Sequence, residues 1–309
     1  MGAYLARHLI ELGHQTAVTK MPQERAELIG IHADDLDVFD LDILEQDAVS
    51  DIIHLTNPDY IFHLAAQSSV AASWKYPGLT ADVNIKGSIH VLEAVRRQEK
   101  NIRVLLIGSS EEYGSILPDE IPVRESHAVH PGNIYAATKA CQNQVGAIYA
   151  QAYGIDVMMV RAFNHIGPHQ APCFAVSGFC KQAAEIEAGF KEPVIYTGNL
   201  EAKRDFTDVR DIVRAYALLV QKGIAGETYN VGSGHAVRIG DLLAMVLAQS
   251  TASICIKADP GRFRPLDVPV IEAEISKIQK ATGWKPQISL SQTVSQTLEA
   301  WRTAVRLHR

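Results

Sequence analysis

Short apolar runs alternate with amphipathic stretches through the first half of the chain. The runs that predict strands lie at residues 16–19, 38–39, 59–66, 102–108 and 155–163. The stretches between them, with apolar residues on one face, predict helices at 3–13, 44–55, 80–98 and 133–152. Strands that are separated by helices of about 12 residues or more favour a parallel sheet. The pattern therefore predicts an α/β fold with a doubly wound parallel sheet.

The pattern of residues changes after Phe163. Proline and glycine recur through 167–200 and 259–269, and residues 227–234 predict a further strand and turn. We expect a first domain over 1–163, to which parts of 205–234 return, and a smaller α/β domain over 164–309.

The first residues are unusual for such a sheet. A doubly wound, Rossmann-type fold normally opens with a strand, a glycine-rich turn and a helix. Here Met1 and Gly2 lead directly into the first predicted helix. The first strand and most of the glycine-rich turn are missing from this sequence, and we expect the native reading frame to begin upstream of Met1.

Composition limits the kind of partner. The chain has 309 residues, of which 47% are hydrophobic and 21% charged, as in ordinary globular proteins. A net charge of −6 gives no reason to expect nucleic-acid binding, which needs a basic face. No apolar run approaches the ~18 residues of a membrane span, and no signal-peptide pattern is present. We expect a small-molecule partner, no nucleic acid, no membrane and a cytoplasmic location.

Cysteine and histidine add no metal or disulfide signal. No pair among the four cysteines has C-x-x-C spacing, so we expect buried, reduced thiols; they are Cys141, Cys173, Cys180 and Cys255. Three of the twelve histidines fall near the candidate site, but none has a partner with ligand spacing; they are His63, His165 and His169. We predict no metal.

The segment "YAATK" carries the clearest chemistry. Tyr135 and Lys139 are four residues apart on a predicted helix and therefore share a face. An ammonium beside a phenol stabilises the phenolate and lowers the pKa of the tyrosine. We therefore expect Tyr135 to act as a proton donor or acceptor near neutral pH.

The segment "IGSSEEYG", residues 107–114, places hydroxyls and carboxylates at the end of a predicted strand. Ligands bind where parallel strands end. Ser109 can there hydrogen-bond the same substrate oxygen that Tyr135 protonates. Ser109, Tyr135 and Lys139, in this order and spacing, resemble the extended short-chain dehydrogenase/reductase family, in its sugar-nucleotide branch.

The resemblance covers nearly the whole chain and points to the GDP-mannose pathway. It is carried by "FHLAAQSSV" (62–70), "GSSEEYG" (108–114), "YAATK" (135–139), "RAFNHIGPHQ" (161–170) and "GNLEAKRDFTDVRDIVRAY" (198–216). It implies that residues 1–163 bind a dinucleotide and that residues 164–309 bind a sugar nucleotide.

The resemblance also implies the roles of the catalytic and substrate residues. Ser109 binds the C4 oxygen of the sugar, Tyr135 donates the proton, and Lys139 tunes Tyr135 and holds the nicotinamide ribose. The residues placed on the substrate side are Ser109, Ser110, Glu111, Asn164, Arg204 and Arg264. The arginines suit bidentate contact with phosphate oxygens.

The cofactor side follows from the same resemblance. Lys20, at the end of a predicted strand, is a cation where NAD enzymes carry an acidic residue, which favours NADP and leaves NAD possible. Gly2 resembles the third glycine of the family's turn, where close packing leaves no room for a side chain. The complete predicted set is Gly2, Lys20, Asp42, Ile43, Leu64, Ala65, Ala66, Asn84, Tyr135 and Lys139.

Three activities remain open at this point. "RDFTDVRDIV" and "NHIGPHQ" resemble the reductases, which imply reduction of a GDP-linked 4-keto-6-deoxyhexose, GDP-4-keto-6-deoxy-D-mannose, to GDP-D-rhamnose or its C4 epimer GDP-6-deoxy-talose. Glu111 stands where the GDP-mannose 4,6-dehydratases use a glutamate as a base, so dehydration is the alternative. A non-catalytic NADP-binding remnant is the second alternative, because the first strand is missing. The resemblance further implies a homodimer paired through the helices around 84–98 and 135–152.

Overall fold

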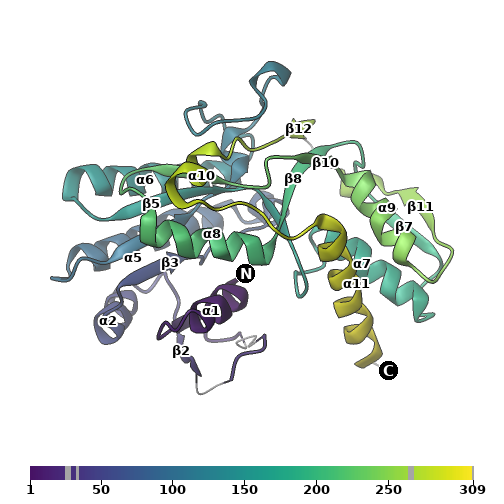
Figure 1. The fold of residues 1–309 in the computed structure, drawn as a ribbon. Helices are drawn as coiled ribbons and strands as arrows, with labels where there is room; N and C mark the ends of the chain where they lie inside the picture. Colours follow the sequence, from purple (N-terminus) through teal and green to yellow (C-terminus); the bar gives the residue numbers. More distant parts are fainter. Residues whose placement is uncertain (25–28, 33–34, 264–267, 308–309) are drawn as a thin grey trace.

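The computed structural model describes residues 1–24, 29–32, 35–263 and 268–307. A larger lobe contains helices α1 (Gly2–Glu11), α2 (Gln46–Thr56), α5 (Gly87–Arg96), α6 (Ile134–Tyr153) and α8 (Val209–Lys222). A smaller lobe carries α7 (Ala175–Glu187), α9 (Ile239–Gln249) and α11 (Leu290–Leu307), as Figure 1 shows.

A four-stranded parallel sheet forms the centre of the larger lobe. Its order is β3 (Tyr60–His63), β4 (Arg103–Ile107), β5 (Val157–Ala162) and β9 (Thr228–Val231). Strand β4 is apolar from Val104 to Ile107 because helices cover both faces of the sheet. Leu105 packs with α8 on one face, whereas Val104 and Leu106 pack with α2 and α5 on the other. The predicted α/β, doubly wound parallel fold is confirmed.

Two further strands precede this sheet. Strands β1 (Ala17–Lys20) and β2 (Asp37–Asp40) form a parallel pair of their own. Helix α1 packs against α8, and its buried Leu5 joins the core beside Leu105. Lys20 and Asp40 end these two strands on the same edge.

The segment between β3 and β4 is more broken than the predicted helix over 80–98. Helices α3 (Val70–Lys75) and α4 (Pro77–Ala81) lead into a turn of π-helix, Asp82–Lys86, which continues as α5. At the start of α5, Gly87 lies against Ile43, and an added Cβ would come within 2.5 Å of the Ile43 Cδ1 atom. Turns of π-helix are frequent at functional sites, and this turn carries Asn84.

The smaller lobe is built on a mixed sheet. Strand β8 (Lys203–Asp208) pairs with β10 (Ala236–Arg238) in antiparallel fashion, and with β12 (Val270–Ile271) and β6 (Asn164–Ile166) in parallel. Strands β7 (Val194–Thr197) and β11 (Cys255–Ala258) form a separate parallel pair. Helix α10 (Ser276–Thr282) returns to the larger lobe, where Ile278 and Trp284 are buried beside α8. The 3-10 turns are η3 (Ser110–Tyr113), η4 (Pro118–Glu120) and η5 (Pro260–Arg262).

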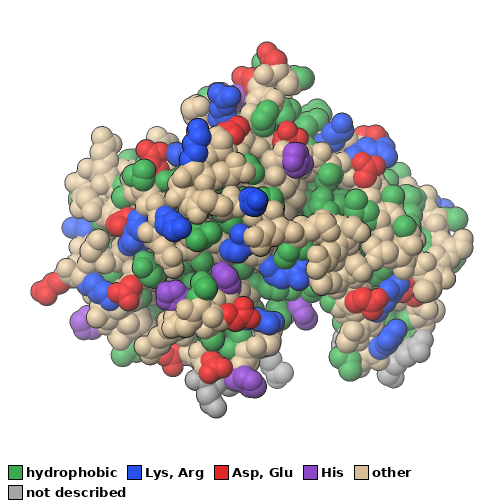
Figure 2. Space-filling model, viewed as in Figure 1, with side chains coloured by type: hydrophobic (Ala, Val, Ile, Leu, Met, Phe, Trp, Pro, Cys, Tyr) green, Lys and Arg blue, Asp and Glu red, His purple; other side chains and the backbone are tan. Residues whose placement is uncertain are grey.

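The cysteines, the helix lengths and the surface charges bear on the expectations from composition. All four cysteines are free, but Cys173 and Cys255 are exposed, so the expectation of uniformly buried thiols is wrong for these two. Over the described residues, no helix combines the length and apolar character needed to cross a bilayer. Acidic and basic side chains are interspersed on the face in Figure 2.

Candidate active site

Ser109 lies where strand β4 ends and the 3-10 turn η3 begins. Its side chain accepts a hydrogen bond from the backbone N–H of Glu111 (3.2 Å), and its own backbone N–H donates to the Glu112 carboxylate (2.8 Å). These reciprocal bonds form a capping box, which fixes the direction of the chain as it leaves the sheet. Ser109 is therefore held at the carboxyl edge of a parallel strand.

Tyr135 and Lys139 lie on one face of helix α6, as predicted. The helix begins after Asn133, whose side chain caps it by accepting a hydrogen bond from the backbone N–H of Ala136 (2.8 Å). Tyr135 is 9% exposed and Lys139 is 3% exposed. Both functional groups are consequently removed from bulk water, where their pKa values respond strongly to their neighbours.

The phenol of Tyr135 meets Ser109. Burial raises the pKa of Tyr135 to about 12, a hydrogen bond with the Ser109 side chain opposes that rise, and the charges of Glu111 and Glu112 add to it. The hydroxyl from the sheet edge and the phenol from α6 thus converge on one point.

Lys139 is directed toward the sheet. Its Nζ atom donates to the backbone carbonyl of Ile107 (2.7 Å) and to Gln142 Oε1 (2.8 Å). Burial lowers the pKa of Lys139 to about 8, and the Glu112 charge acts in the opposite direction. The expectation that Lys139 lowers the pKa of Tyr135 is wrong for this state, because that pKa is raised and Lys139 is not among its causes.

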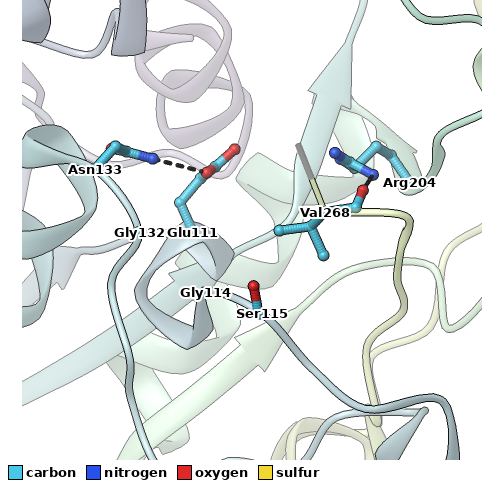
Figure 3. Close-up of a pocket in the computed structure, with 7 residues that line it drawn as sticks. All are labelled: Glu111, Gly114, Ser115, Gly132, Asn133, Arg204 and Val268. Atoms are coloured by element: carbon cyan, nitrogen blue, oxygen red, sulfur yellow. Dashed lines mark hydrogen bonds between the residues drawn. The ribbon is translucent and has the colours of Figure 1, made fainter. Parts of the chain in front are cut away.

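Glu111 and Arg204 face each other across a small cavity of about 30 Å³ (Figure 3). Asn133 donates a hydrogen bond to the Glu111 carboxylate (3.2 Å), so the residue that caps α6 also orients Glu111. Arg204, 7% exposed, donates to the carbonyl of Val268 (2.5 Å). Ligand sites usually measure ~300–1,000 Å³, so a hexose between these two side chains requires the walls to separate.

The other predicted substrate residues are more widely placed. Ser110 is buried (5% exposed) in the first turn after Ser109. Asn164 is exposed at the start of β6, where it pairs with Phe206 of β8. Arg264 lies outside the described residues.

The predicted adenosine-side residues lie at the ends of the first two strands. Lys20 is ion-paired with Asp40, its neighbour across the β1–β2 register. Asp42 accepts a hydrogen bond from the backbone of Leu44 (3.0 Å), which shapes the turn after β2. Ile43 is buried, and its carbonyl accepts a hydrogen bond from His90 (2.9 Å).

The small-residue stretch Leu64, Ala65 and Ala66 follows β3 directly and is half-buried. Leu64 lies beside the start of α1, but a Cβ added to Gly2 would meet its Cδ1 atom only at 3.9 Å, an ordinary contact. The expectation that close packing leaves no room for a side chain at Gly2 is therefore wrong for the described residues.

Asn84 supports the wall of the site from within. It is fully buried; its amide nitrogen donates to Thr138 Oγ1 (2.9 Å) and to the Gln67 carbonyl (3.1 Å), and its oxygen accepts from the Gln67 N–H (2.8 Å). Both amide N–H groups are thus used by the protein. Asn84 ties the π-helical turn to α6 and to the segment after β3, and it braces the site.

Glu112 is a site residue that was not among those expected from the sequence. From the sequence alone, a glutamate next to Glu111 is expected to lie in a polar turn, but Glu112 is fully buried. The only available signal was the S-x-x-E spacing of Ser109 and Glu112, which is the pattern of a capping box.

A second hollow lies away from the site. A larger hollow of about 350 Å³ lies in the smaller lobe between Glu187, Arg302 and Arg306, away from Ser109 and Tyr135. We assign the chemistry to the smaller cavity, because the buried titratable groups gather there. In the described part of the chain, no group of three or more His, Cys, Asp or Glu side chains is placed to hold a metal ion.

The residues present fit a nicotinamide cofactor. Lys139 is a buried ammonium with three N–H donors, of which two have neutral acceptors among the described residues. The third donor can bind a ribose hydroxyl beside Tyr135. The fold and this Ser–Tyr–Lys site together define an NAD(P)-dependent oxidoreductase of the extended short-chain dehydrogenase/reductase type.

Comparison with known proteins specifies the family. The family model described as GDP-mannose 4,6 dehydratase matches residues 1–297, and the chain belongs to this family. A protein of Pseudomonas aeruginosa named GDP-6-deoxy-D-mannose reductase is 31% identical over 265 residues, which cover 86% of this chain and 87% of the relative. A GDP-mannose 4,6-dehydratase of Yersinia enterocolitica is 28% identical and covers 94% of this chain and 88% of its own length. The chain is thus similar to both reductases and dehydratases of GDP-sugars.

Solved structures show the same fold. The structure of RMD from Pseudomonas aeruginosa complexed with NADPH superposes with a TM-score of 0.84 at 27% identity, covering 94% of this chain and all (100%) of that one. UDP-glucose 4-epimerase of Thermotoga maritima, with UDP-glucose, gives a TM-score of 0.86 at 26% identity and covers 98% and 96% of the two chains.

Proposed function

We propose that this protein reduces the C4 ketone of GDP-4-keto-6-deoxy-D-mannose, with GDP-D-rhamnose or its C4 epimer GDP-6-deoxy-talose as the product. The single observation that carries the proposal is that Ser109 and the phenol of Tyr135 meet at the carboxyl edge of β4, close enough for the serine side chain to lower the pKa of the phenol by hydrogen bonding. A carbonyl oxygen placed between these two groups receives hydrogen bonds from both. The similarity to a relative named GDP-6-deoxy-D-mannose reductase supports the choice of substrate.

The residues of this chain supply the proton and the polarisation. A pKa of about 12 keeps Tyr135 protonated through the neutral range, as a proton donor requires. Ser109 stabilises the negative charge that develops on the oxygen before Tyr135 protonates it. Bound NADPH supplies the hydride, so one ketone, one NADPH and one proton yield one alcohol and one NADP⁺. Tyr135 then recovers its proton from solvent.

The two lobes divide the binding work in this proposal. Residues 1–163, with α8 and β9, hold the cofactor, and residues 164–309 hold the GDP-sugar. Arg204, which belongs to the smaller lobe, binds an anionic group of the substrate, since it lines the cavity opposite Glu111. Lys20 favours NADPH over NADH, although its pairing with Asp40 must be exchanged for the 2′-phosphate.

A dehydratase activity is the second candidate, and one observation favours it. Glu111 lines the same cavity as Arg204, and Asn133 holds its carboxylate there. A carboxylate in this position can remove a proton from a sugar carbon, as a 4,6-dehydration needs. This reaction returns the hydride to the sugar and consumes no reduced cofactor overall.

One experiment separates the two reactions. Purified protein is incubated with GDP-4-keto-6-deoxy-D-mannose and NADPH or NADH, and in parallel with GDP-mannose and NADP⁺. We expect loss of reduced cofactor with the keto sugar and formation of a GDP-deoxyhexose. Glu111→Gln should retain most of the reduction and abolish any dehydration. Failure to consume either reduced cofactor in the presence of the keto sugar contradicts the proposal.

We further propose that the protein forms a homodimer through α5 and α6. Helix α6 exposes the apolar side chains of Ile148 (53%) and Tyr153 (56%), which a second copy of the chain would cover. Light scattering should give twice the mass of one chain, and the Ile148→Lys variant should have the mass of a single chain.

A further inference from the structure

Glu112 is a carboxylate with no exposed surface, held between three elements of the site. Its oxygens accept hydrogen bonds from the Ser109 backbone N–H (2.8 Å), from Asn143 Nδ2 on α6 (2.9 and 3.1 Å) and from Arg161 Nε on β5 (3.0 Å). Every one of these partners is a donor. A carboxylate surrounded only by donors is stabilised in its ionised form, and Arg161 supplies the matching charge.

These contacts connect the two halves of the Ser109–Tyr135 pair. The bond to the Ser109 N–H sets the backbone of the serine, whereas the bond to Asn143 reaches the helix that carries Tyr135 and Lys139. Gly108 allows this close packing, because an added Cβ would lie 2.3 Å from Glu112 Oε1 and 2.2 Å from Asn143 Nδ2. Glu112 is thus a direct bridge between the end of β4 and α6, beside the bond from Lys139 to the Ile107 carbonyl.

The charge of Glu112 also reaches the proton-handling groups. Burial lowers the pKa of Lys139 to about 8, and Glu112 is the charge that opposes this shift. Glu112 likewise adds to the rise in the pKa of Tyr135. The titratable and charged groups coupled to Glu112 or Lys139 from the packed elements are His63 on β3, Tyr135 on α6 and Arg161 on β5. Glu111 acts in turn on Tyr135, and the Tyr113 ring lies against Arg161.

Burial acts against the charge on Glu112 that these donors stabilise, and the pKa of its carboxyl is raised. Desolvation raises its pKa, and Arg161 and the hydrogen bonds from Ser109 and Asn143 act against the rise. Arg161 is itself fixed, since it lies over the Tyr113 ring (4.6 Å) and donates to the carbonyl of Glu125 (3.0 Å). The buried pair is therefore built into the wall of the site from several sides.

We propose that Glu112 is a positioning residue, which aligns Ser109 with Tyr135 through the Ser109 backbone and helix α6 and which serves as the counter-charge of the buried Lys139 ammonium at the end of β4. The catalytic part of this inference rests on the proposed reduction. The electrostatic part does not, because it concerns a property of the folded protein alone.

The test uses Glu112→Gln, which keeps the shape of the side chain and removes its charge. Removal of a nearby opposite charge should lower the pKa of Lys139 by about one unit or more. Because Lys139 must be protonated to hold the cofactor ribose, the alkaline limb of kcat/KM for reduction should move to lower pH by the same amount. At a pH below that limb, kcat should still fall, because Ser109 loses its alignment, with a smaller change in KM.

Glu187→Gln is the matched control. Glu187 is a mostly buried carboxylate that, like Glu112, is paired with an arginine, Arg302 (2.7 Å), but it lies at the end of α7 in the smaller lobe. Its substitution should reduce stability without moving the alkaline limb. Glu112→Asp, which retains the charge on a shorter side chain, should restore the position of the limb but not the full kcat.

A readout that needs no turnover separates this proposal from the proposed function. The pH titration of Lys139 is followed by NMR in protein labelled at lysine side chains, with the resonance assigned from Lys139→Arg. A lower Lys139 pKa in Glu112→Gln supports the proposal even if the protein reduces no keto sugar. An unchanged Lys139 pKa, or an unchanged alkaline limb in an active protein, overturns it.

Loss of one partner of a buried pair can also unfold a protein. The double variant Glu112→Gln with Arg161→Gln removes both charges and covers that case. Arg161 carries the same charge as Lys139, so its removal acts against the loss of Glu112, and the double variant should show a smaller lowering of the Lys139 pKa than Glu112→Gln. Wild-type values of both the Lys139 pKa and kcat in a folded double variant overturn the proposal as well.

Discussion

The side chain of Ser109, where β4 ends, meets the phenol of Tyr135 on α6, and its hydrogen-bonding interaction lowers the pKa of that phenol. The two residues come from different elements and meet above the same edge of the sheet. Tyr135→Phe removes the proton donor and should reduce kcat for reduction by about 10²–10⁴-fold. Ser109→Ala should reduce it by about 10²–10³-fold, the usual cost of one oxyanion donor. NADPH binding, measured by fluorescence, should persist in both, and full activity in Tyr135→Phe would contradict the assigned role.

Lys139 should make stability depend on pH in a defined direction. The folded state lowers its pKa from 10.5 to about 8, so between these values the unfolded chain binds more protons than the folded one. The free energy of unfolding therefore rises with pH across this window, by about 3 kcal/mol at most for a shift of this size. Urea unfolding at pH 8 and pH 10 should show this rise in the wild type relative to Lys139→Met. If the free energy of unfolding changed equally with pH in the two proteins, this would be evidence against a strongly lowered Lys139 pKa.

Asn133 has two tasks that substitution can separate. Asn133→Ala removes both the α6 cap and the donor to Glu111, and should cost about 1 kcal/mol of stability together with activity. Asn133→Ser keeps a capping oxygen but loses the amide donor, so its stability should stay near wild type while any dehydratase activity falls. Equal losses of stability in the alanine and serine variants would show that the cap contributes little.

Gly108 has no room for a side chain. A Cβ there would lie 2.6 Å from the backbone carbonyl oxygen of Val160, which cannot move without disturbing β5. Gly108→Ala should therefore cost about 1–3 kcal/mol and displace Glu112, with a fall in kcat. Gly78→Ala is the control, because nothing lies within 4 Å of its added Cβ and α4 is helical there. It should be neutral or slightly stabilising, as chemical denaturation of both variants can determine.

The local pattern of the sequence determined most of the secondary structure of the larger lobe. Each predicted strand and helix before Phe163 has a counterpart in the structure, because apolar periodicity and glycine or proline boundaries are local properties of the chain. The exception is the segment over 80–98, where a π-helical turn interrupts the helix. That turn is stabilised by the contacts of Asn84 with Gln67 and Thr138, which are distant in sequence.

The sequence by itself also determined which residue types could carry the chemistry, since Ser109, Tyr135 and Lys139 are recognisable by spacing. Only the tertiary structure decided how these groups are protonated and aimed. Lys139 donates to the Ile107 carbonyl and does not lower the pKa of Tyr135. Lys20 forms an ion pair with Asp40, and Glu112 connects three elements of the site by hydrogen bonds. The physical reason is that desolvation and hydrogen bonding depend on which elements pack together, and a linear motif does not contain that information.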